Sequence, residues 1–292
     1  MLRRIFIYVA AVLVFVFCAG PLLLTAIGSV VPEAAILSSP PRWFSERPTL
    51  ENFDYIFTGR LPTVYARRAS DRSMISETAR QIPGAMLNSA AIAVSVMAVN
   101  IVFASMAAYA FARLNFKGKQ VTFMGIVMCR LIPAAALVVP FYLILQAAGL
   151  LDTMVAIIAL HSLLTLPFSV LILSLFFSKV PVEIEESARV DGASSLQTFR
   201  KITLPLSASS IVATGLFAFM LSYSEFLYAL VLGGTAKTRT LPVVMASLSN
   251  NPDVAWTLLM SGVFLTLIPT LILVIVVWRF VVENIILGAS KY

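Results

Sequence analysis

Long apolar stretches constrain this chain more than any other feature. A helix that crosses a bilayer needs about 20 consecutive, mostly apolar residues. Its backbone must be helical, because the hydrocarbon core offers no other partner for the N–H and C=O groups. Stretches of this length lie at residues 5–31, 86–112, 121–146, 153–177, 206–232 and 257–280. The sequence therefore predicts an all-α, polytopic membrane protein with six transmembrane helices.

Composition agrees with this class. The chain is 60% hydrophobic and only 12% charged, whereas soluble domains average about 25% charged residues. The net charge of +7 comes mostly from basic residues that flank the apolar stretches, as membrane topology requires, so we expect no nucleic-acid partner. Cys18 and Cys129 both lie inside apolar stretches, which predicts neither a disulfide nor a metal pair.

Short loops indicate the orientation. The loops at 113–120 and 178–205 are rich in Lys and Arg, whereas the turn at 146–152 has neither. Arg3 and Arg4 precede the first apolar stretch. By the positive-inside rule, both termini and the two basic loops are cytoplasmic.

The long loop after the first stretch opposes this orientation, because it is rich in arginine. Its arginines are Arg42, Arg47, Arg60, Arg67, Arg68, Arg72 and Arg80. The rule weakens for long loops, so the short loops decide. We divide the chain into residues 1–85, with a retained first helix and an extracytoplasmic loop, and residues 86–292, a five-helix core. The extracytoplasmic loop predicts a short helix after Thr49 and an Arg-rich insert near 60–80.

The loop at 178–205 is polar and ordered. Pro181 suits a first helical turn, where its missing N–H is harmless, and Gly192 is a natural helix stop. Ser194 and Gln197 have capping-box spacing for a second helix. The sequence therefore predicts a helix, a glycine turn and a helix. Small apolar stripes are formed by Ile184 and Ala188 on the first helix and by Leu196 and Phe199 on the second.

The first of these two helices is acidic. Glu183, Glu185 and Glu186 lie near its start, where the helix dipole favours anions. A helix that rests on lipid headgroups usually presents Lys and Arg instead, and anionic lipid would repel these acids. A protein partner with a basic rim fits this helix better than a lipid surface does.

The same loop resembles a known signature. Glu186-Ser187-Ala188, three residues, Gly192, nine residues and Ile202-Thr203-Leu204-Pro205 resemble the EAA signature of ABC-importer permeases, with Ser187 as the only departure. Other stretches resemble patterns of the maltose-transporter-like, CUT1-type branch of carbohydrate permeases. They are AAYAFARLNFKGK at 107–119, PFYLILQAAGLLDT at 140–153 and SYSEFLYAL at 222–230.

This resemblance implies an ABC type I importer permease fold in the bacterial inner membrane, without enzymatic activity or a cofactor of its own. It implies several partners: a sibling permease in a heterodimer, a dimer of cytoplasmic ATP-binding subunits, and an extracytoplasmic solute-binding protein. ATP and Mg would belong to the ATPase, since the chain has no G-x-x-x-x-G-K-[ST] loop. The implied solute is a sugar or a sugar derivative.

The resemblance also implies that loop 178–205 docks in a groove of the ATPase and couples ATPase motion to alternating access. Glu186 and Asp191 would face or brace that groove, Ala188 would let the helix sit close, and Gly192 would make the turn. The full set of expected coupling residues is Glu185, Glu186, Ser187, Ala188, Asp191, Gly192, Leu196 and Phe199.

Arg130 and Glu225 are charged residues that lie well inside the apolar stretches. Arg130 is about 15 Å deep at 1.5 Å per residue, where an unpaired charge is costly. Glu225 lies nearer the outer side, so a direct ion pair between them is not expected. One interpretation is a translocation path lined by Arg130, Tyr223, Glu225 and Tyr228. The alternatives are a structural ion pair or a bond to a neighbouring subunit. Arg130 alone has two further roles open to it: recognising an anionic sugar, or satisfying the backbone at a kink before Pro133.

Two other function classes remain open from the residues alone. An ion-coupled secondary transporter would use Arg130 and Glu225, although that class is expected to carry several acids inside its spans. An intramembrane enzyme would need a paired nucleophile and base, or metal ligands. His161 is the only histidine and has no second ligand nearby in sequence, so we predict neither a metal site nor a proton relay.

Overall fold

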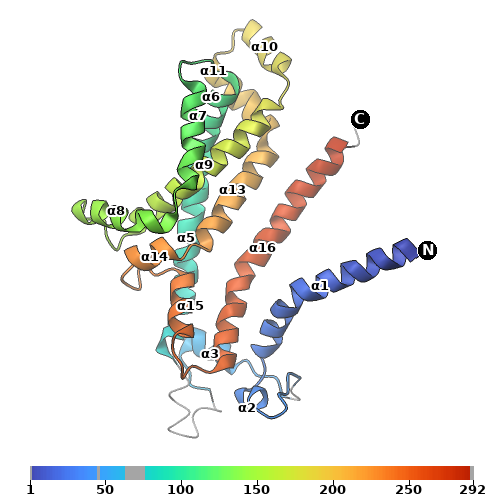
Figure 1. The fold of residues 1–292 in the computed structure, drawn as a ribbon, viewed down its shortest axis with the longest axis vertical. Helices are drawn as coiled ribbons and strands as arrows, with labels where there is room; N and C mark the ends of the chain where they lie inside the picture. The colour runs from blue at the N-terminus through green and yellow to red at the C-terminus, as the bar shows by residue number, and fades with distance from the viewer. Residues whose placement is uncertain (1, 45–46, 63–75, 290–292) are drawn as a thin grey trace. The chain divides into compact units, whose positions relative to one another are not determined.

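The computed structural model describes residues 2–44, 47–62 and 76–289, with side chains as far as Ile275. Part of the predicted Arg-rich insert, including Arg67, Arg68 and Arg72, lies outside these residues. Throughout the described ranges every regular element is a helix (Figure 1), which confirms the all-α prediction.

The helices follow one another in this order. The first half of the chain forms α1 (Leu2–Gly28), α2 (Glu33–Ile36), α3 (Glu51–Thr58), the 3₁₀ turn η2 (Glu77–Gln81), α5 (Ile82–Val99), the π-helical turn η3 (Asn100–Ala104), α6 (Ser105–Arg113), α7 (Lys119–Met128), the 3₁₀ turn η4 (Cys129–Leu131) and α8 (Ala134–Ala147). The second half forms α9 (Met154–Ser178), α10 (Val182–Val190), α11 (Ser195–Thr198), the π-helical turn η5 (Phe199–Thr203), α12 (Leu204–Leu206), α13 (Ala208–Tyr223), α14 (Leu227–Leu232), α15 (Leu241–Ser249) and α16 (Trp256–Ala289).

The chain folds as two compact units. One unit consists of Met1–Met86 with Leu241–Thr270, and the other of Leu87–Thr240 with Leu271–Tyr292.

In the described residues, 4 helices are long and apolar enough to cross a membrane on their own. They are α1, the run from η2 to α6, α9, and α16. Two further runs qualify only as bent pairs: α7 with η4 and α8, bent by 99°, and α11 to α12 with α13, bent by 79°. Counting each bent pair as one span gives 6 spans, the number predicted from the sequence.

The third and fifth apolar stretches are not the continuous helices that their hydropathy predicted. In the third, Ile132 has an extended backbone with ψ of 124°, because the residue before a proline is driven out of the helical region. Pro133 then starts α8 in a new direction. The fifth is interrupted at Ser207 and again at residues 224–226.

α9 is the central helix of the second unit. It packs against α6, η3, α13 and α14, and it lies alongside α6 and α13 in Figure 1. Ile157, Leu173 and Phe177 are fully buried against these neighbours. The buried face also carries small residues such as Ala156 and Ser169, which allow the close backbone approach typical of helix packing in membranes.

Glu33 holds the start of α16 within the first unit. Its carboxylate accepts hydrogen bonds from the backbone N–H groups of Trp256 at 3.0 Å and Thr257 at 2.8 Å. Two of the N–H groups that a helix start leaves unpaired are satisfied in this way, and the anion complements the helix dipole. Asn52 on α3 donates a further hydrogen bond to the Thr257 hydroxyl at 3.0 Å.

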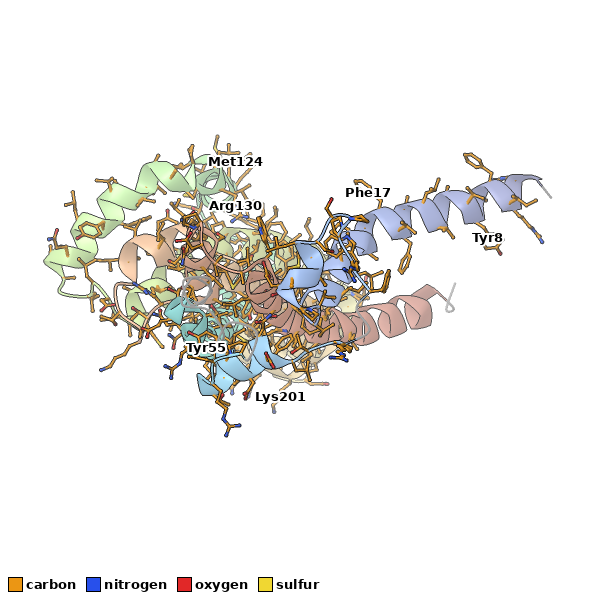
Figure 2. All side chains as sticks on the ribbon, turned by 90° about the horizontal axis from the view of Figure 1, so that it is seen from below. Tyr8, Phe17, Tyr55, Met124, Arg130 and Lys201 are labelled. Atoms are coloured by element: carbon orange, nitrogen blue, oxygen red, sulfur yellow. The ribbon has the colours of Figure 1, made fainter. Side chains whose placement is uncertain are left out.

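α1 and α3 also belong to the first unit. The short helix predicted after Thr49 is confirmed as α3, and the Thr49 hydroxyl accepts the backbone N–H of Glu51 at 3.2 Å. α1 keeps its apolar side chains uncovered: Tyr8 and Phe17 are exposed and project from the helix (Figure 2). A surface of this kind is suited to lipid or to another membrane subunit.

Asp152, which the sequence analysis did not single out, fixes the turn between α8 and α9. Its backbone has a φ of 57°, a left-handed conformation that Asp tolerates better than most residues. One carboxylate oxygen accepts hydrogen bonds from the Thr238 hydroxyl and from the backbone N–H groups of Thr235 at 3.0 Å and Gly234 at 2.8 Å. These hydrogen bonds lower the pKa of Asp152 from 3.8 to about 2.

The lowered pKa predicts a pH-dependent effect of Asp152→Asn. The ionised carboxylate stabilises the folded chain above its unfolded pKa, and this contribution is lost as the pH falls toward the folded pKa of about 2. We expect the wild type to melt at a higher temperature than the variant between about pH 7 and about pH 5, and this difference to shrink below about pH 4. Thermal unfolding in mild detergent measures it.

Asp253→Asn, at an exposed acid in the loop before α16, is the matched control and should leave the melting temperature unchanged. A wild-type advantage over Asp152→Asn that persists undiminished at about pH 3 would contradict the assigned role of the carboxylate.

Candidate functional site

A cavity in the second unit lies where several helices depart from regular geometry. Its volume is about 470 Å³. Residues of η4, α8, α9, α13 and the chain that follows α13 line it. Its polar lining consists of Arg130, His161, Thr165, Ser222 and Glu225. Leu131, Leu137, Phe141, Leu163, Leu164 and Leu221 supply an apolar wall.

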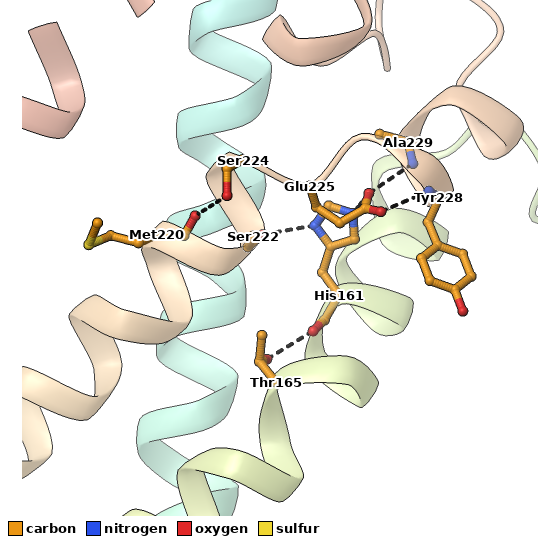
Figure 3. A network of polar contacts seen from close by, with 8 residues as sticks. All are labelled: His161, Thr165, Met220, Ser222, Ser224, Glu225, Tyr228 and Ala229. Carbon is orange, nitrogen blue, oxygen red and sulfur yellow. Dashed lines mark hydrogen bonds and ion pairs between the residues drawn. The ribbon is translucent and has the colours of Figure 1, made fainter. Parts of the chain in front are cut away.

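Glu225 compensates the backbone where the fifth apolar stretch breaks. Its Oε1 accepts the backbone N–H of Tyr228 at 2.9 Å, and its Oε2 accepts that of Ala229 at 3.2 Å (Figure 3). Both N–H groups belong to the start of α14, where they have no partner within the helix. Leaving them bare in apolar surroundings would be costly, so Glu225 has a structural role at this break.

His161 joins α9 to both sides of the same break. Its Nε2 lies 2.9 Å from Oε2 of Glu225, and its Nδ1 lies 2.8 Å from the hydroxyl of Ser222 (Figure 3). Ser222 lies in the last turn of α13, whereas Glu225 precedes α14. The imidazole is only 1% exposed, so the contact holds the interrupted helix against the central helix of the unit.

The polar network continues to the second and third apolar stretches. Asn100, in the π-helical turn η3, donates a hydrogen bond to the Thr165 hydroxyl at 2.8 Å, and Thr165 donates to the His161 carbonyl at 2.8 Å. At the other end, the Tyr228 hydroxyl donates to the carbonyl of Ala134 at 2.9 Å. Ala134 is the first residue of α8, directly after the break in the third stretch. The irregular points of the second, third and fifth stretches are therefore linked to one another through α9.

Arg130 lies in η4 at the cavity wall. Its Nη1 donates to the carbonyl of Leu164 on α9 at 2.7 Å, and its guanidinium lies 6.0 Å from the ring centre of Phe168. Among the residues that the structure describes, Arg130 forms no ion pair with Glu225. One role left open by the sequence was that Arg130 satisfies the backbone at the kink before Pro133. The structure instead shows Arg130 bonded to a backbone carbonyl on α9, close to Pro167.

The structure brings together only half of the predicted path residues. Arg130 and Glu225 line the cavity, whereas Tyr223 and Tyr228 are buried and do not line it. Sequence reasoning missed His161 as the partner of Glu225 and Ser222 as the partner of His161, and it missed Asn100. A buried polar residue inside an apolar stretch was the available signal, but it does not say which two stretches face each other.

The helix–turn–helix predicted for loop 178–205 is confirmed. α10 begins directly after Pro181, and Gly192 follows it with a φ of 88°, a conformation that glycine adopts without strain. The Ser194 hydroxyl accepts the backbone N–H of Gln197 at 3.3 Å, and the Gln197 side chain accepts the N–H of Ser194 at 2.8 Å. This reciprocal pair is the predicted capping box.

The predicted coupling residues fall on different faces of this loop. The exposed ones are Glu186, Ser187, Asp191, Gly192 and Leu196, and Ala188 is half-buried. Glu185 and Phe199 are buried. Phe199 packs on Tyr109 of α6, with ring centres 4.8 Å apart, and Phe177 of α9 at 6.5 Å. The second half of the loop is therefore anchored in the core of the second unit.

A comparison with known protein families identifies the family of this chain. The profile of the family described as "Binding-protein-dependent transport system inner membrane component" matches residues 100–286. The chain belongs to this family. The matched residues include the cavity, its polar network and loop 178–205. The family predicted from the motifs is thereby confirmed, and the chain is an ABC transporter permease, a multi-pass protein of the inner membrane.

Similar proteins include several curated permeases. The trehalose/maltose transport system permease protein MalG of Thermococcus litoralis is 28% identical over 99% of this chain and 98% of its own length. The diacetylchitobiose uptake system permease protein DasC of Streptomyces coelicolor is 29% identical over 99% of this chain and 97% of its own. The trehalose transport system permease protein SugB of Mycobacterium tuberculosis is 32% identical over 71% and 76%.

One solved structure has the same fold. It is the crystal structure of a bacterial ABC transporter involved in the import of the acidic polysaccharide alginate. The likeness has a TM-score of 0.68 with 21% sequence identity, and it covers 95% of this chain and 97% of that one. The predicted permease fold is thereby confirmed.

The His161–Glu225 contact predicts an energetic coupling between α9 and the break before α14. In a double-mutant cycle of His161→Phe and Glu225→Gln, we expect a coupling free energy of about 0.6–1.7 kcal/mol, from the average to the maximum found in double-mutant cycles of polar pairs between membrane helices. Reversible unfolding in lipid–detergent mixtures gives the free energies of unfolding for the cycle.

Ser224→Ala is the matched control, because Ser224 lies in the same break but bonds only to the carbonyl of Met220 within its own segment. Paired with His161→Phe, it should give a coupling free energy near zero. Equal coupling from Ser224 and Glu225 would rule out a specific contact.

Proposed function

We propose that this chain is the permease subunit of an ATP-driven, binding-protein-dependent importer for a sugar or a sugar derivative. The observation that carries this proposal is the family match over residues 100–286, which includes an intact helix–glycine turn–helix in loop 178–205. The sugar class is supported by the curated relatives, whose names refer to trehalose, maltose and diacetylchitobiose.

The importer would contain three kinds of partner besides this chain. A sibling permease completes the pore, a dimer of cytoplasmic ATPases binds ATP and Mg, and an extracytoplasmic binding protein delivers the solute. Both termini and loop 178–205 face the cytoplasm in this arrangement, in keeping with the basic short loops. The exposed apolar surface of α1 suits contact with lipid or with the sibling subunit.

Loop 178–205 is the contact with the ATPase in this proposal. Its exposed face combines the acids Glu186 and Asp191 with the apolar side chains of Ile184, Val190 and Leu196. Exposed apolar side chains rimmed by charge are typical of a protein interface. Closure of the ATPase dimer would move this face as a rigid body and so change the access of the pore.

The cavity at Arg130 and Glu225 is the part of the translocation path that this subunit contributes. The cavity lining combines apolar side chains with hydroxyl, imidazole, carboxylate and guanidinium groups, which suits a sugar ring with its apolar faces and hydroxyl edges. The secondary-transporter alternative is less well supported than the importer, because Arg130 and Glu225, the charged groups among the described residues that line the cavity, bond to the backbone of α9 and α14.

The ATPase contact predicts the effect of Glu186→Lys. When the tagged chain is purified from native membranes in mild detergent, we expect ATP hydrolysis in the eluate. Charge reversal at the contact should lower the hydrolysis recovered per permease by about tenfold, equivalent to about 1.4 kcal/mol of binding free energy. Asp253→Lys, the same reversal in the loop before α16, should leave it unchanged.

Two results would count against this proposal. If Glu186→Lys recovered as much ATP hydrolysis per permease as the wild type, the contact with the ATPase would have to lie in another loop. Absence of any ATPase from the wild-type eluate, in several mild detergents, would contradict the importer itself.

The two native cysteines allow the proposed translocation path to be tested by chemical labelling. Cys129 lines the cavity, whereas Cys18 lies on α1. In a Cys18→Ser background, we expect a small methanethiosulfonate reagent to react with Cys129. Because the attached group fills the path, uptake from a panel of radiolabelled mono- and disaccharides should fall about tenfold or more. The reaction should be slower when the transported sugar is present. The Cys129→Ser protein, with Cys18 intact, is the insensitive control.

Complete labelling of Cys129 with unchanged uptake would show that the cavity is not on the path.

A further inference from the structure

A buried ion pair ties the loop at 178–205 to the end of the second apolar stretch. Nε of Arg113, the last residue of α6, lies 3.0 Å from Oε1 of Glu185 on α10. The two side chains are only 7% and 1% exposed. Nη2 of Arg113 also donates to the carbonyl of Val180, at 2.5 Å, just before α10 begins. One guanidinium therefore holds α10 and the chain that enters it.

The same carboxylate reaches the segment that leads into the fifth apolar stretch. The hydroxyl of Thr203, which is fully buried in η5, donates to Oε1 of Glu185 at 2.9 Å. A single oxygen atom thus joins three segments: the end of α6, the middle of α10, and η5. We call Arg113, Glu185 and Thr203 the brace.

The chemistry of the brace favours a geometric role over a purely stabilising one. A buried ion pair is often no more stabilising than a well-packed apolar pair of the same size, because both ions lose their hydration. Oε2 of Glu185 has no hydrogen-bond partner among the described residues, so the desolvation is not fully compensated. What the pair adds is direction, since a planar guanidinium fixes the angle and register of its partners.

Without the brace, α10 has little to hold it to the apolar helices. Its remaining packing is mainly against α11 and η5, within the same loop. Phe199 anchors the second half of the loop in the core, but the first half has no aromatic anchor of this kind among the described contacts. The exposed residues on α10, including Glu186, therefore depend on Glu185 for their position.

We propose that Arg113, Glu185 and Thr203 are positioning residues that make α10 move as one body with the second and fifth apolar stretches. The proposal rests on the function proposed above, in which a partner ATPase pushes on the exposed face of α10. Force applied there reaches α6 through Arg113 and α13 through Thr203. Adjacent residues of one helix then have separate tasks: Glu186 faces the partner and Glu185 faces inward.

The first test measures the rigidity of the brace directly. Spin labels at exposed Val190 on α10 and at Met220 on α13 report a distance distribution in the assembled complex in nanodiscs. We expect a narrow distribution in the wild type, with the same mean distance before and after addition of MgATP and vanadate. Glu185→Gln and Arg113→Gln should broaden it about twofold, because the loop then moves relative to α13. Glu183→Gln, at an exposed acid of the same helix, should leave it narrow.

The second test measures coupling. With the labelled sugar that the complex accumulates, we expect Glu185→Gln to keep ATP hydrolysis within about twofold of wild type while the sugar imported per ATP falls about tenfold. The exchange variant Arg113→Glu with Glu185→Arg should restore a large part of this ratio, since the pair re-forms with opposite polarity.

The possible results of these two tests bear separately on the brace and on the proposed importer function. A distribution that stays narrow in Glu185→Gln and Arg113→Gln overturns the brace while leaving the importer intact. Import and ATP hydrolysis that fall in equal proportion reduce the pair to a folding contact and also overturn it. A wild-type complex without ATP hydrolysis overturns the proposed function, and the brace as a coupling device with it.

Discussion

Backbone groups that lack partners inside apolar surroundings are the constraint on which the rest of this structure depends. A regular helix satisfies them by itself, but the third and fifth apolar stretches break. Around the cavity, polar side chains bond to backbone groups: Glu225 caps α14, Arg130 donates to the carbonyl of Leu164, and Tyr228 donates to that of Ala134. Two of the polar groups that line the cavity, those of Arg130 and Glu225, are therefore there to satisfy the backbone.

Two polar contacts among the described residues of the second unit hold different parts of it together. His161 and Glu225 hold the interrupted fifth stretch against α9 in the middle of the apolar region. Arg113 and Glu185 hold loop 178–205 to the end of α6. α9 lies next to both, through the His161 network and through Phe177 against Phe199. A displacement of the loop thus has a continuous path of packed and hydrogen-bonded groups toward the cavity, as rigid-body coupling between distant sites requires.

The sequence predicted the elements whose signal is local. Apolar length identified the spans, Ser194 and Gln197 identified a capping box, Gly192 identified a turn, and the spacing from Glu186 to Pro205 identified the family. It did not predict the break at 224–226, because Glu225 looks the same in a continuous helix as at a helix start. Nor did it predict that His161 meets Glu225, since that contact depends on which helices are neighbours, and neighbours are set by packing of whole faces rather than by any short motif.

Glu185 and Glu186 show most clearly what a motif leaves open. They are adjacent acids on one helix, only Glu186 belongs to the EAA signature, and the sequence analysis placed both among the expected coupling residues. Successive residues on an α-helix point about 100° apart, at 3.6 residues per turn, so one of the two can face the core whenever the other faces the partner. The structure buries Glu185 against Arg113 and exposes Glu186. An acid that binds a partner can be exchanged when the partner changes with it, whereas the acid beneath it is constrained by this chain alone. The inward acid would thus depend on Arg113 and Thr203, and the outward acid on the shape of another protein.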